Sequence, residues 1–254
     1  MTVRVGIAGI RGRMGKEIAA AATADPSVAL VGGLVRRLDG GTGEPLLVVD
    51  DPGAILPEID VLIDFTRPEG TEALAGVCAE AGVPLVCGTT GLDENQTSAL
   101  RAAAARVPVF YAANMSPGVN AVLAVLPLLT RALDGYDIEI VETHHRYKAD
   151  APSGTALALG RAITGDAAAL ERRAIHGREG VRPRTAAEIG MHAVRGGGNP
   201  GEHAVIFVND GEEVRVLHRA FSRAAYAQGA VRAARLIAGQ EPGFYGPTTL
   251  PGFL

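Results

Sequence analysis

Apolar residues in the first half of the chain form short runs that predict strands and helices in turn. The strand-like runs lie at 3–8, 28–35, 61–65, 83–87 and 107–111. Helix-like runs separate several of them, at 15–23, 69–81 and 94–106. Strands that alternate with helices of this length predict a parallel sheet covered on both faces, which is the doubly wound, Rossmann-type α/β architecture.

The pattern changes after Asn114. Residues 121–133 and 156–163 predict helices, and residues 137–143 alternate like a half-buried strand. Two alternating runs, 203–208 and 214–219, flank Asn209-Asp210-Gly211-Glu212, a turn sequence typical of an antiparallel hairpin. We therefore expect a second, α+β domain with an open mixed or antiparallel sheet at 116–226. The first domain would comprise 1–115, completed by 227–254 with a helix at 229–238.

Composition narrows the classes of protein to which the chain can belong. It is 47% hydrophobic and 20% charged, as in ordinary globular proteins, and its net charge of −4 argues against a general nucleic-acid binder. No apolar run approaches the roughly 20 residues that span a bilayer, and the N-terminus lacks the layout of a signal peptide, so we expect a cytoplasmic protein without membrane contact. Cys78 and Cys87 lie outside any metal-binding spacing, so we expect buried thiols and no metal site; a reactive thiol is the alternative.

A glycine-rich turn joins the first predicted strand to the first predicted helix. It reads Gly9-Ile10-Arg11-Gly12-Arg13-Met14-Gly15, and its G-x-x-G-x-x-G spacing differs from the common dinucleotide fingerprint G-x-G-x-x-G. Glycines let backbone amides approach a pyrophosphate at the positive end of a helix. A purely structural turn would have the same spacing, but the position after the first strand favours a dinucleotide site.

The end of the second predicted strand bears on the choice between NADH and NADPH. A carboxylate there would bind the ribose 2′-hydroxyl of NAD. The chain instead has Arg36 and Arg37, and guanidinium groups suit a 2′-phosphate. We therefore expect NADPH to be preferred, with NADH possible as a cofactor; the alternative is that both arginines belong to a solvated loop. Arg11 and Arg13 are further candidates for the same phosphate.

Three more loops follow predicted strands, at the sheet edge where doubly wound proteins bind ligands. They are Phe65-Thr66-Arg67-Pro68, Cys87-Gly88-Thr89-Thr90-Gly91 and Ala112-Ala113-Asn114-Met115. Gly88, Thr89 and Thr90 are candidates for contacts with ribose or the nicotinamide amide. The last loop leads into the second domain, which suits a hinge. One such loop is a weak signal, whereas three at one edge favour a cofactor site.

The most informative segment runs from Glu142 to Ala156. It reads Glu-Thr-His-His-Arg-Tyr-Lys-Ala-Asp-Ala-Pro-Ser-Gly-Thr-Ala and ends where a helix begins. Helix amides and hydroxyl donors at Ser153-Gly154-Thr155 make an anion site, and Lys148 is one of only two lysines among 24 basic residues. Together these features predict a pocket for a small, multiply charged acid; the alternative is a surface loop with solvated charges.

This segment and the glycine-rich turn resemble the 4-hydroxy-tetrahydrodipicolinate reductase family. The motif Thr-His-His-x-x-Lys-x-Asp-Ala-Pro-Ser-Gly-Thr-Ala carries the resemblance, together with Gly-x-x-Gly-x-Met-Gly upstream. Further matching segments are Asp64–Thr66, Cys87–Gly91, Asn114–Asn120, Arg178–Gly180, His192–Gly197 and Gly201–His203. In this family a hydride passes to a conjugated cyclic imine after loss of water, giving tetrahydrodipicolinate on the route to diaminopimelate and lysine.

The resemblance implies a role for each matching residue. His144 would be the acid/base and Lys148 a proton donor, while His145, Ser153, Gly154 and Thr155 would hold the carboxylates of a dicarboxylate substrate. Gly9 to Met14, Phe65, Gly88 to Thr90 and Ala112 to Met115 would bind the dinucleotide, with Arg36 at the 2′-phosphate. The family is also tetrameric, so we expect a homotetramer.

The chain departs from the family pattern at two places, and its C-terminal sequence at 246–250 looks unusual. The family often has an acid near Val35, and it commonly has Asp where this chain has Gly198-Asn199-Pro200. Two other functions remain as alternatives: a dehydrogenase acting on another small oxo-acid, and a nucleotide-binding sensor without catalysis.

Overall fold

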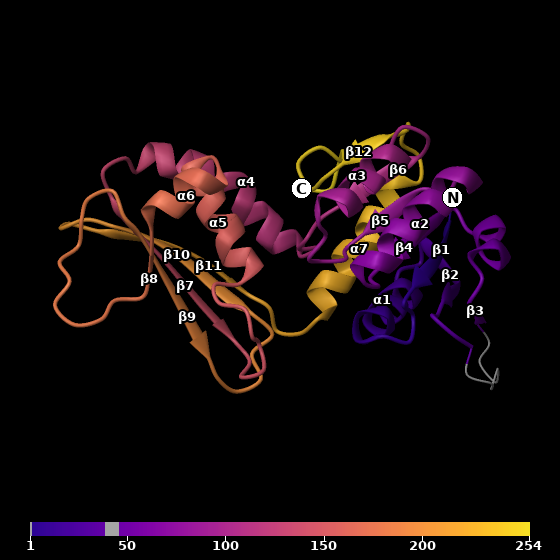
Figure 1. The fold of residues 1–254 in the computed structure, drawn as a ribbon, viewed down its shortest axis with the longest axis horizontal. Coiled ribbons are helices and arrows are strands. Elements are labelled where there is room, and N and C mark those ends of the chain that lie inside the picture. The colour runs from indigo at the N-terminus through magenta and orange to yellow at the C-terminus, as the bar shows by residue number, and fades with distance from the viewer. Residues whose placement is uncertain (1, 39–45) are drawn as a thin grey trace. The chain divides into compact units, whose positions relative to one another are not determined.

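The computed structural model describes residues 2–38 and 46–254, which form two compact units (Figure 1). The first unit comprises residues 1–117 and 223–254, and the second comprises 118–222. Among the described residues, no helix combines the length and apolar character that crossing a membrane requires.

A seven-stranded sheet forms the centre of the first unit, and all its strand pairs are parallel. In spatial order its strands are β12 (Gly243–Tyr245), β6 (Pro108–Tyr111), β5 (Leu85–Cys87), β4 (Val61–Asp64), β1 (Val3–Ala8), β2 (Val28–Leu34) and β3 (Leu47–Val49). The chain proceeds from β1 to β2 on one side and then continues with β4 on the other. This reversal creates the switch point at which open α/β sheets bind ligands.

Helices cover both faces of this sheet. On one face α1 (Arg13–Ala24) packs with α7 (Ala224–Ile237), and on the other α2 (Pro68–Ala81) packs with α3 (Glu94–Ala103). Each pair has its own apolar core, with Ile18 and Ala230 in the first and Leu74 and Leu100 in the second. The expected doubly wound α/β fold is therefore confirmed. Two short 3-10 helices, η1 (Pro52–Ala54) and η2 (Leu56–Glu58), precede β4.

Both cysteines are fully buried in the core between the sheet and the helices α2 and α3, Cys78 on α2 and Cys87 at the end of β5. Burial raises the pKa of each thiol, Cys78 and Cys87, to about 12. Because the thiolate is the reactive form, neither residue is a nucleophile near neutral pH.

The C-terminal segment completes the core of the first unit. β12 pairs with β6, and the fully buried ring of Phe253 lies 4.9 Å from that of Phe110, measured between ring centroids. Arg232 of α7 also donates a hydrogen bond of 2.7 Å to the Gly252 carbonyl. Within 246–250, the segment whose sequence looked unusual, Leu250 is buried in the same core.

The second unit contains a mixed five-stranded sheet. Its order is β11 (Glu213–Arg219), β10 (Glu202–Val208), β7 (Asp137–His144), β9 (Ile189–Arg195) and β8 (Ala174–His176). The pairs of β10 are antiparallel and those of β9 are parallel. Three helices accompany the sheet: α4 (Pro117–Ala132), α5 (Gly154–Thr164) and α6 (Ala167–Arg173). Ile138, Ile140 and Phe207 of the sheet pack against Leu159 of α5 and Leu126 of α4.

Several elements lie where the sequence pattern predicted none, namely β3, α6, β8, β9 and β12. Most are too short to show a period. β9 is longer, but only its first three residues are buried, so it does not alternate. It also contains Gly190, at which a Cβ would lie 1.6 Å from a carboxylate oxygen of Glu139. A glycine inside a strand weakens the strand signal in the sequence, although close approach requires it here.

Candidate active site

Strand β7 brings polar side chains to the covered face of the second sheet. Alternate residues of this strand are buried, namely Ile138, Ile140, Glu142 and His144. The first two join the apolar core, whereas the last two place a carboxylate and an imidazole at the end of the strand. A buried carboxylate requires partners that compensate for its lost hydration.

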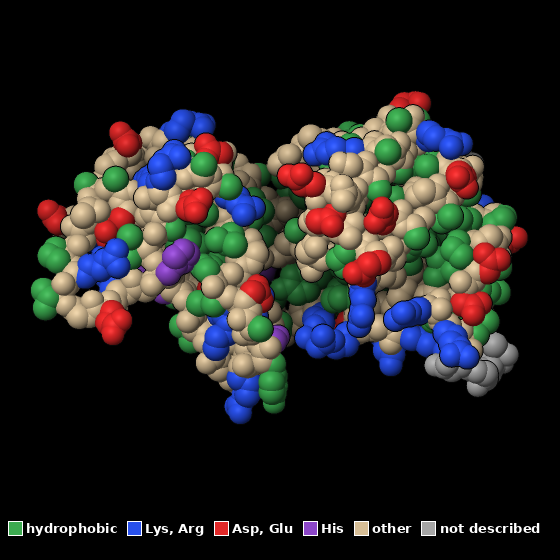
Figure 2. Space-filling model, viewed as in Figure 1, with side chains coloured by type: hydrophobic (Ala, Val, Ile, Leu, Met, Phe, Trp, Pro, Cys, Tyr) green, Lys and Arg blue, Asp and Glu red, His purple; other side chains and the backbone are tan. Residues whose placement is uncertain are grey.

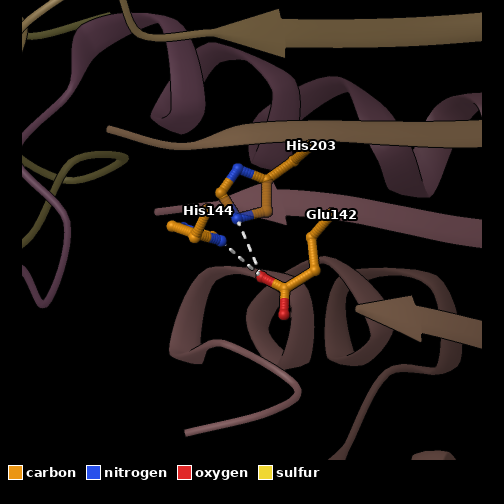
Figure 3. Close-up of side chains that lie close together, drawn as sticks. All are labelled: Glu142, His144 and His203. Carbon is orange, nitrogen blue, oxygen red and sulfur yellow. Dashed lines mark ion pairs between the residues drawn. The ribbon is translucent and has the colours of Figure 1, made fainter. Parts of the chain in front are cut away.

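The neighbouring strands supply those partners through their register. His203 of β10 lies opposite Glu142, and Arg195 of β9 lies opposite His144. The Arg195 guanidinium donates a hydrogen bond of 2.7 Å to Glu142 Oε1. Glu142 Oε2 lies 3.0 Å from Nδ1 of His144 and 3.6 Å from Nε2 of His203 (Figure 3). The contact with His144 has the distance of an ion pair but lacks the alignment of a good hydrogen bond.

Burial and charge act in opposite directions on this cluster. Burial disfavours the ionised form of Glu142, but His144, Ser153 and Arg195 outweigh that effect and hold the pKa of its carboxyl well below the usual range. Burial and the nearby His144 lower the pKa of His203 to about 4. At neutral pH the cluster therefore contains an ionised Glu142 balanced by Arg195, beside a neutral His203.

Ser153 connects the start of α5 to the same carboxylate. Its amide donates a hydrogen bond of 3.0 Å to Glu142 Oε1, and its Oγ accepts one of 3.1 Å from the Ala156 amide. The same Oγ lies 3.1 Å from Nε2 of His203. Ser153 is the N-cap of α5, and Gly154 and Thr155 lie in the first turn of the helix that it caps.

The loop between β7 and α5 holds the other expected substrate residues. Lys148 Nζ is paired with Asp150 at 2.8 and 2.9 Å, and this pairing lowers the pKa of the Asp150 carboxyl. Arg195 donates a second hydrogen bond of 2.7 Å, to the Asp150 carbonyl. The His145 amide donates to the carbonyl of Asn199 at 2.8 Å. The Gly198-Asn199-Pro200 departure therefore supports the backbone beside His145.

The residues expected to bind or protonate the substrate differ in how they relate to Glu142. His144 and Ser153 contact Glu142 directly, whereas Lys148 pairs within its own loop. Sequence reasoning assigned no role to Glu142, His203 or Arg195, although all three lie in segments that resemble the family. An acid at an inward position of a strand is a signal that could have identified Glu142, because such a residue requires buried partners.

The same cluster has donor atoms that a divalent transition metal accepts. Glu142, His144 and His203 each offer one ligand atom, all within 4.8 Å of one another. The carboxylate, however, already has two hydrogen-bond donors, the Arg195 side chain and the Ser153 amide. The buried carboxylate is thus compensated by groups of the protein itself.

In the first unit, the glycine-rich turn packs tightly against itself before α1 begins. Gly9 has a φ of 79°, and a Cβ at Gly15 would lie 2.2 Å from the Gly9 carbonyl oxygen. Gly12 is the N-cap of α1 and offers no capping side chain. The Gly9 amide donates to Leu34 at the end of β2, 2.9 Å away. Backbone amides at an uncapped helix start beside β2 fit the pyrophosphate of a dinucleotide.

Asp64, at the end of β4, organises two of the expected cofactor loops. It is fully buried and accepts hydrogen bonds from the Thr66 amide at 2.9 Å, from the Thr66 and Thr71 hydroxyls, and from Thr89 at 3.4 Å. Burial outweighs these bonds and raises the pKa of the Asp64 carboxyl. The Phe65 ring covers Gly88, where a Cβ would lie 2.2 Å from the ring. The loops after β4 and β5 are therefore in contact.

The remaining residues expected to bind the cofactor differ in exposure. Ile10, Ala112 and Met115 are buried in the core, so a dinucleotide would reach only their backbone groups. Ala113 and Thr90 are exposed, and Asn114 accepts a hydrogen bond of 2.9 Å from the Ser116 amide.

Basic side chains gather on one edge of the first unit. Figure 2 shows Lys and Arg side chains along the lower edge, over the region where Figure 1 labels α1 and β3. The exposed basic residues of the turn, of α1 and of the segment after β2 are Arg11, Arg13, Lys16, Arg36 and Arg37. This edge is suited to an anionic ligand.

Comparison with known proteins agrees with this arrangement. The family model described as dihydrodipicolinate reductase, N-terminus, matches residues 3–115, and the corresponding C-terminus model matches 118–250. Relatives named 4-hydroxy-tetrahydrodipicolinate reductase are 49% identical in Rubrobacter xylanophilus and 47% identical in Thiobacillus denitrificans. The alignments cover 96% of this chain, and 96% and 97% of the two relatives.

A solved structure has the same fold. It is a dipicolinate-bound dihydrodipicolinate reductase from Paenisporosarcina sp. TG-14, with a TM-score of 0.77 and 23% identity over 97% of this chain and 98% of that chain. The two family models together span nearly the whole sequence, and the relatives match over almost their full length. This chain therefore belongs to the dihydrodipicolinate reductase family.

Proposed function

We propose that this chain reduces 4-hydroxy-tetrahydrodipicolinate to tetrahydrodipicolinate, on the route to diaminopimelate and lysine, with NADPH as the preferred reductant. The observation that carries the proposal is the polar end of β7. There a buried, ionised Glu142 contacts His144, while Ser153 places the start of α5 beside the same carboxylate. An imidazole, a nearby ammonium and a helix N-terminus suit a small dicarboxylate that must be protonated.

The first unit would hold the dinucleotide, which supplies a hydride when bound. The residues that would contact it are Gly9, Ile10, Arg11, Gly12, Arg13, Met14, Phe65, Gly88, Thr89, Thr90, Ala112, Ala113, Asn114 and Met115. The glycine-rich turn supports this role because α1 begins there without a side-chain cap.

The second unit would hold the substrate. The first-turn amides of α5 at Gly154 and Thr155, with Ser153 and His145, would bind the carboxylates. Reduction of the conjugated imine leaves an electron-rich, enamine-type carbon, which must then gain a proton. His144 and Lys148 are the groups that would provide it, and the surrounding cations would offset negative charge during transfer.

The preference for NADPH rests on the segment after β2. Leu34, the last residue of β2, accepts a hydrogen bond from the Gly9 amide. Arg36 and Arg37, two and three residues later, therefore begin beside the glycine-rich turn. Both guanidinium groups are exposed, as binding of a ribose 2′-phosphate requires.

We also propose that the chain forms a homotetramer through the second sheet. Val141 and Leu217 both pair with Ala204 of β10, and Val194 pairs with Thr143, so all three lie on the face opposite to Glu142 and His144. Val194 and Leu217 are about half exposed, at 49% and 51%. Light scattering after size-exclusion chromatography measures the assembly, and a stable monomer would refute the tetramer.

A coupled assay tests the reaction. It generates the unstable substrate in place and follows oxidation of NADPH or NADH through the near-ultraviolet absorbance of the reduced nicotinamide. We expect rapid oxidation that requires the substrate and is faster with NADPH. No oxidation with either cofactor, by a protein that binds NADPH, would reject the proposed function.

A further inference from the structure

We propose that Glu142 is a positioning residue that holds the proton of a neutral His144 on Nδ1, leaving Nε2 as the nitrogen that exchanges a proton with the substrate. The inference rests on the proposed acid/base role of His144. It assigns a role to the buried carboxylate of Glu142, which takes no part in the proposed proton and hydride transfers.

The first step is the identity of the atom next to the ring. Glu142 Oε2 lies closer to Nδ1 of His144, at 3.0 Å, than to Nε2 of His203, at 3.6 Å. Both oxygens belong to a side chain that is only 1% exposed, so water does not compete for them. A carboxylate has no proton to donate, so a neutral ring beside it is favoured with its N–H on Nδ1.

The second step is the fixed orientation of the carboxylate. Oε1 accepts hydrogen bonds from Arg195 and from the Ser153 amide, at 2.7 and 3.0 Å. These two donors come from β9 and from the start of α5, and they leave Oε2 to face the imidazoles (Figure 3). Arg195 also supplies the positive charge that keeps Glu142 ionised inside the protein.

The third step concerns the charged groups around His144. Glu142 lies on the same strand, His203 comes from β10, Arg195 from β9, and Lys148 and Asp150 from the loop before α5. Lys148 and Asp150 offset each other, and His203 stays neutral in its buried position. Glu142 is therefore the anion in direct contact with the His144 ring.

Replacement of Glu142 by glutamine has an unusual consequence in this setting. Arg195 and the Ser153 amide are both donors, so the oxygen of the new side-chain amide must stay where Oε1 is now. Its NH2 group then takes the place of Oε2 and donates toward Nδ1 of His144. E142Q should thus move the His144 proton to Nε2, with little change in shape. In the Ser-His-Asp triad the same exchange of acid for amide lowers kcat by about 10⁴-fold through the wrong tautomer.

Nitrogen-15 NMR of histidine-labelled protein tests the tautomer, and the coupled assay tests turnover. In the native protein we expect the Nδ1–H form of His144, and in E142Q the Nε2–H form. We expect kcat of E142Q to fall by about 10²-fold or more and the dissociation constant for NADPH to stay unchanged. A purely structural role would not switch the tautomer.

The chain offers a matched control on the same strand. Glu139 Oε2 lies 2.7 Å from Nε2 of His192, on the opposite face of the sheet from Glu142. E139Q is the same exchange beside another histidine, so we expect kcat within about twofold of native in the folded protein. A comparable loss in E139Q would attribute the effect of E142Q to general disruption of the sheet and overturn the inference.

Two outcomes separate this inference from the proposed function. If H144Q keeps near-native kcat, the acid/base role of His144 fails. If H144Q is severely impaired but E142Q keeps native turnover and tautomer, the role of Glu142 fails alone. Should E142Q not fold, the native spectrum still decides, because a neutral His144 protonated on Nε2 would overturn the inference.

Discussion

Oγ of Ser153 lies 3.1 Å from Nε2 of His203, although 50 residues separate them in the sequence. The contact joins the start of α5 to β10 above the Glu142 carboxylate. It also depends on a histidine that the fold keeps neutral, which makes the stability of the protein sensitive to acid.

The pH dependence of unfolding should show the contribution of His203. Its pKa is about 4 in the folded protein, against 6.5 for an ordinary histidine. Between pH 6.5 and 4, the unfolded chain therefore binds a proton at this histidine and the folded protein does not. The free energy of unfolding falls as pH decreases from about 6.5 to 4. One proton over this window corresponds to about 3 kcal/mol.

Urea unfolding at a series of pH values measures this effect. The free energy of unfolding of H203Q should lack this component and decline less steeply than that of the native protein across the window. H176Q, at an exposed histidine, should decline as the native protein does. Parallel curves for native and H203Q would contradict the assignment. Glu142 adds a further loss of stability at lower pH. Its pKa is depressed in the folded protein, so its partners stabilise the fold only while the carboxyl is ionised.

Removal of the His144 imidazole should affect turnover far more than cofactor binding. His144 lies in the second unit, whereas the glycine-rich turn lies in the first. We expect H144A to lower kcat by about 10²- to 10⁴-fold, the usual range for a general acid or base, with the NADPH dissociation constant unchanged. Steady-state kinetics and fluorescence titration measure the two quantities. Equal losses in both would count against the acid/base role.

Replacement of Lys148 by Arg separates charge from proton donation. Arg can keep the ion pair with Asp150 but does not release a proton near neutral pH. We expect K148R to lose about 10²-fold or more in kcat. The exposed Arg106 provides the reverse exchange as a control, and R106K should be close to native. Near-normal turnover of K148R would reject Lys148 as a donor.

A charge reversal at Arg36 should change the choice of cofactor. A carboxylate there repels a 2′-phosphate and can accept a hydrogen bond from a ribose 2′-hydroxyl. We expect R36E to lower the ratio of kcat/KM for NADPH over NADH by about tenfold, equivalent to about 1.4 kcal/mol. R106E is a suitable control, since Arg106 is exposed between α3 and the start of β6. An unchanged ratio in R36E would refute the role of this arginine.

The C-terminal tail should contribute to stability rather than to catalysis. Phe253 is fully buried against Phe110, whereas the next residue, Leu254, is 49% exposed. F253A should lower the free energy of unfolding by about 3 to 5 kcal/mol, as expected for a large-to-small substitution in a core. L254A should lower it by less than about 1 kcal/mol. Denaturant unfolding measures both, and equal small losses would show that the tail does not complete the core.

The pattern of apolar residues along the chain was sufficient to predict most strands of the first unit. Strands β1, β2, β4, β5 and β6 are short apolar runs separated by turns and helix-like segments, so their positions follow from the sequence alone. Strands β3, β8 and β12 have three residues each and show no period. They form because a neighbouring strand offers unpaired backbone groups, and that neighbour is known only once the chain has folded.

The sequence by itself determined the glycine-rich turn and the polar segment from His144 to Thr155, because each depends on residues that are close along the chain. The tertiary structure alone decided that Glu142, His203 and Arg195 meet, since they come from three strands whose register brings them together. A carboxylate at an inward position cannot be interpreted until its partners are known, because its ionisation depends on the charges and donors that surround it.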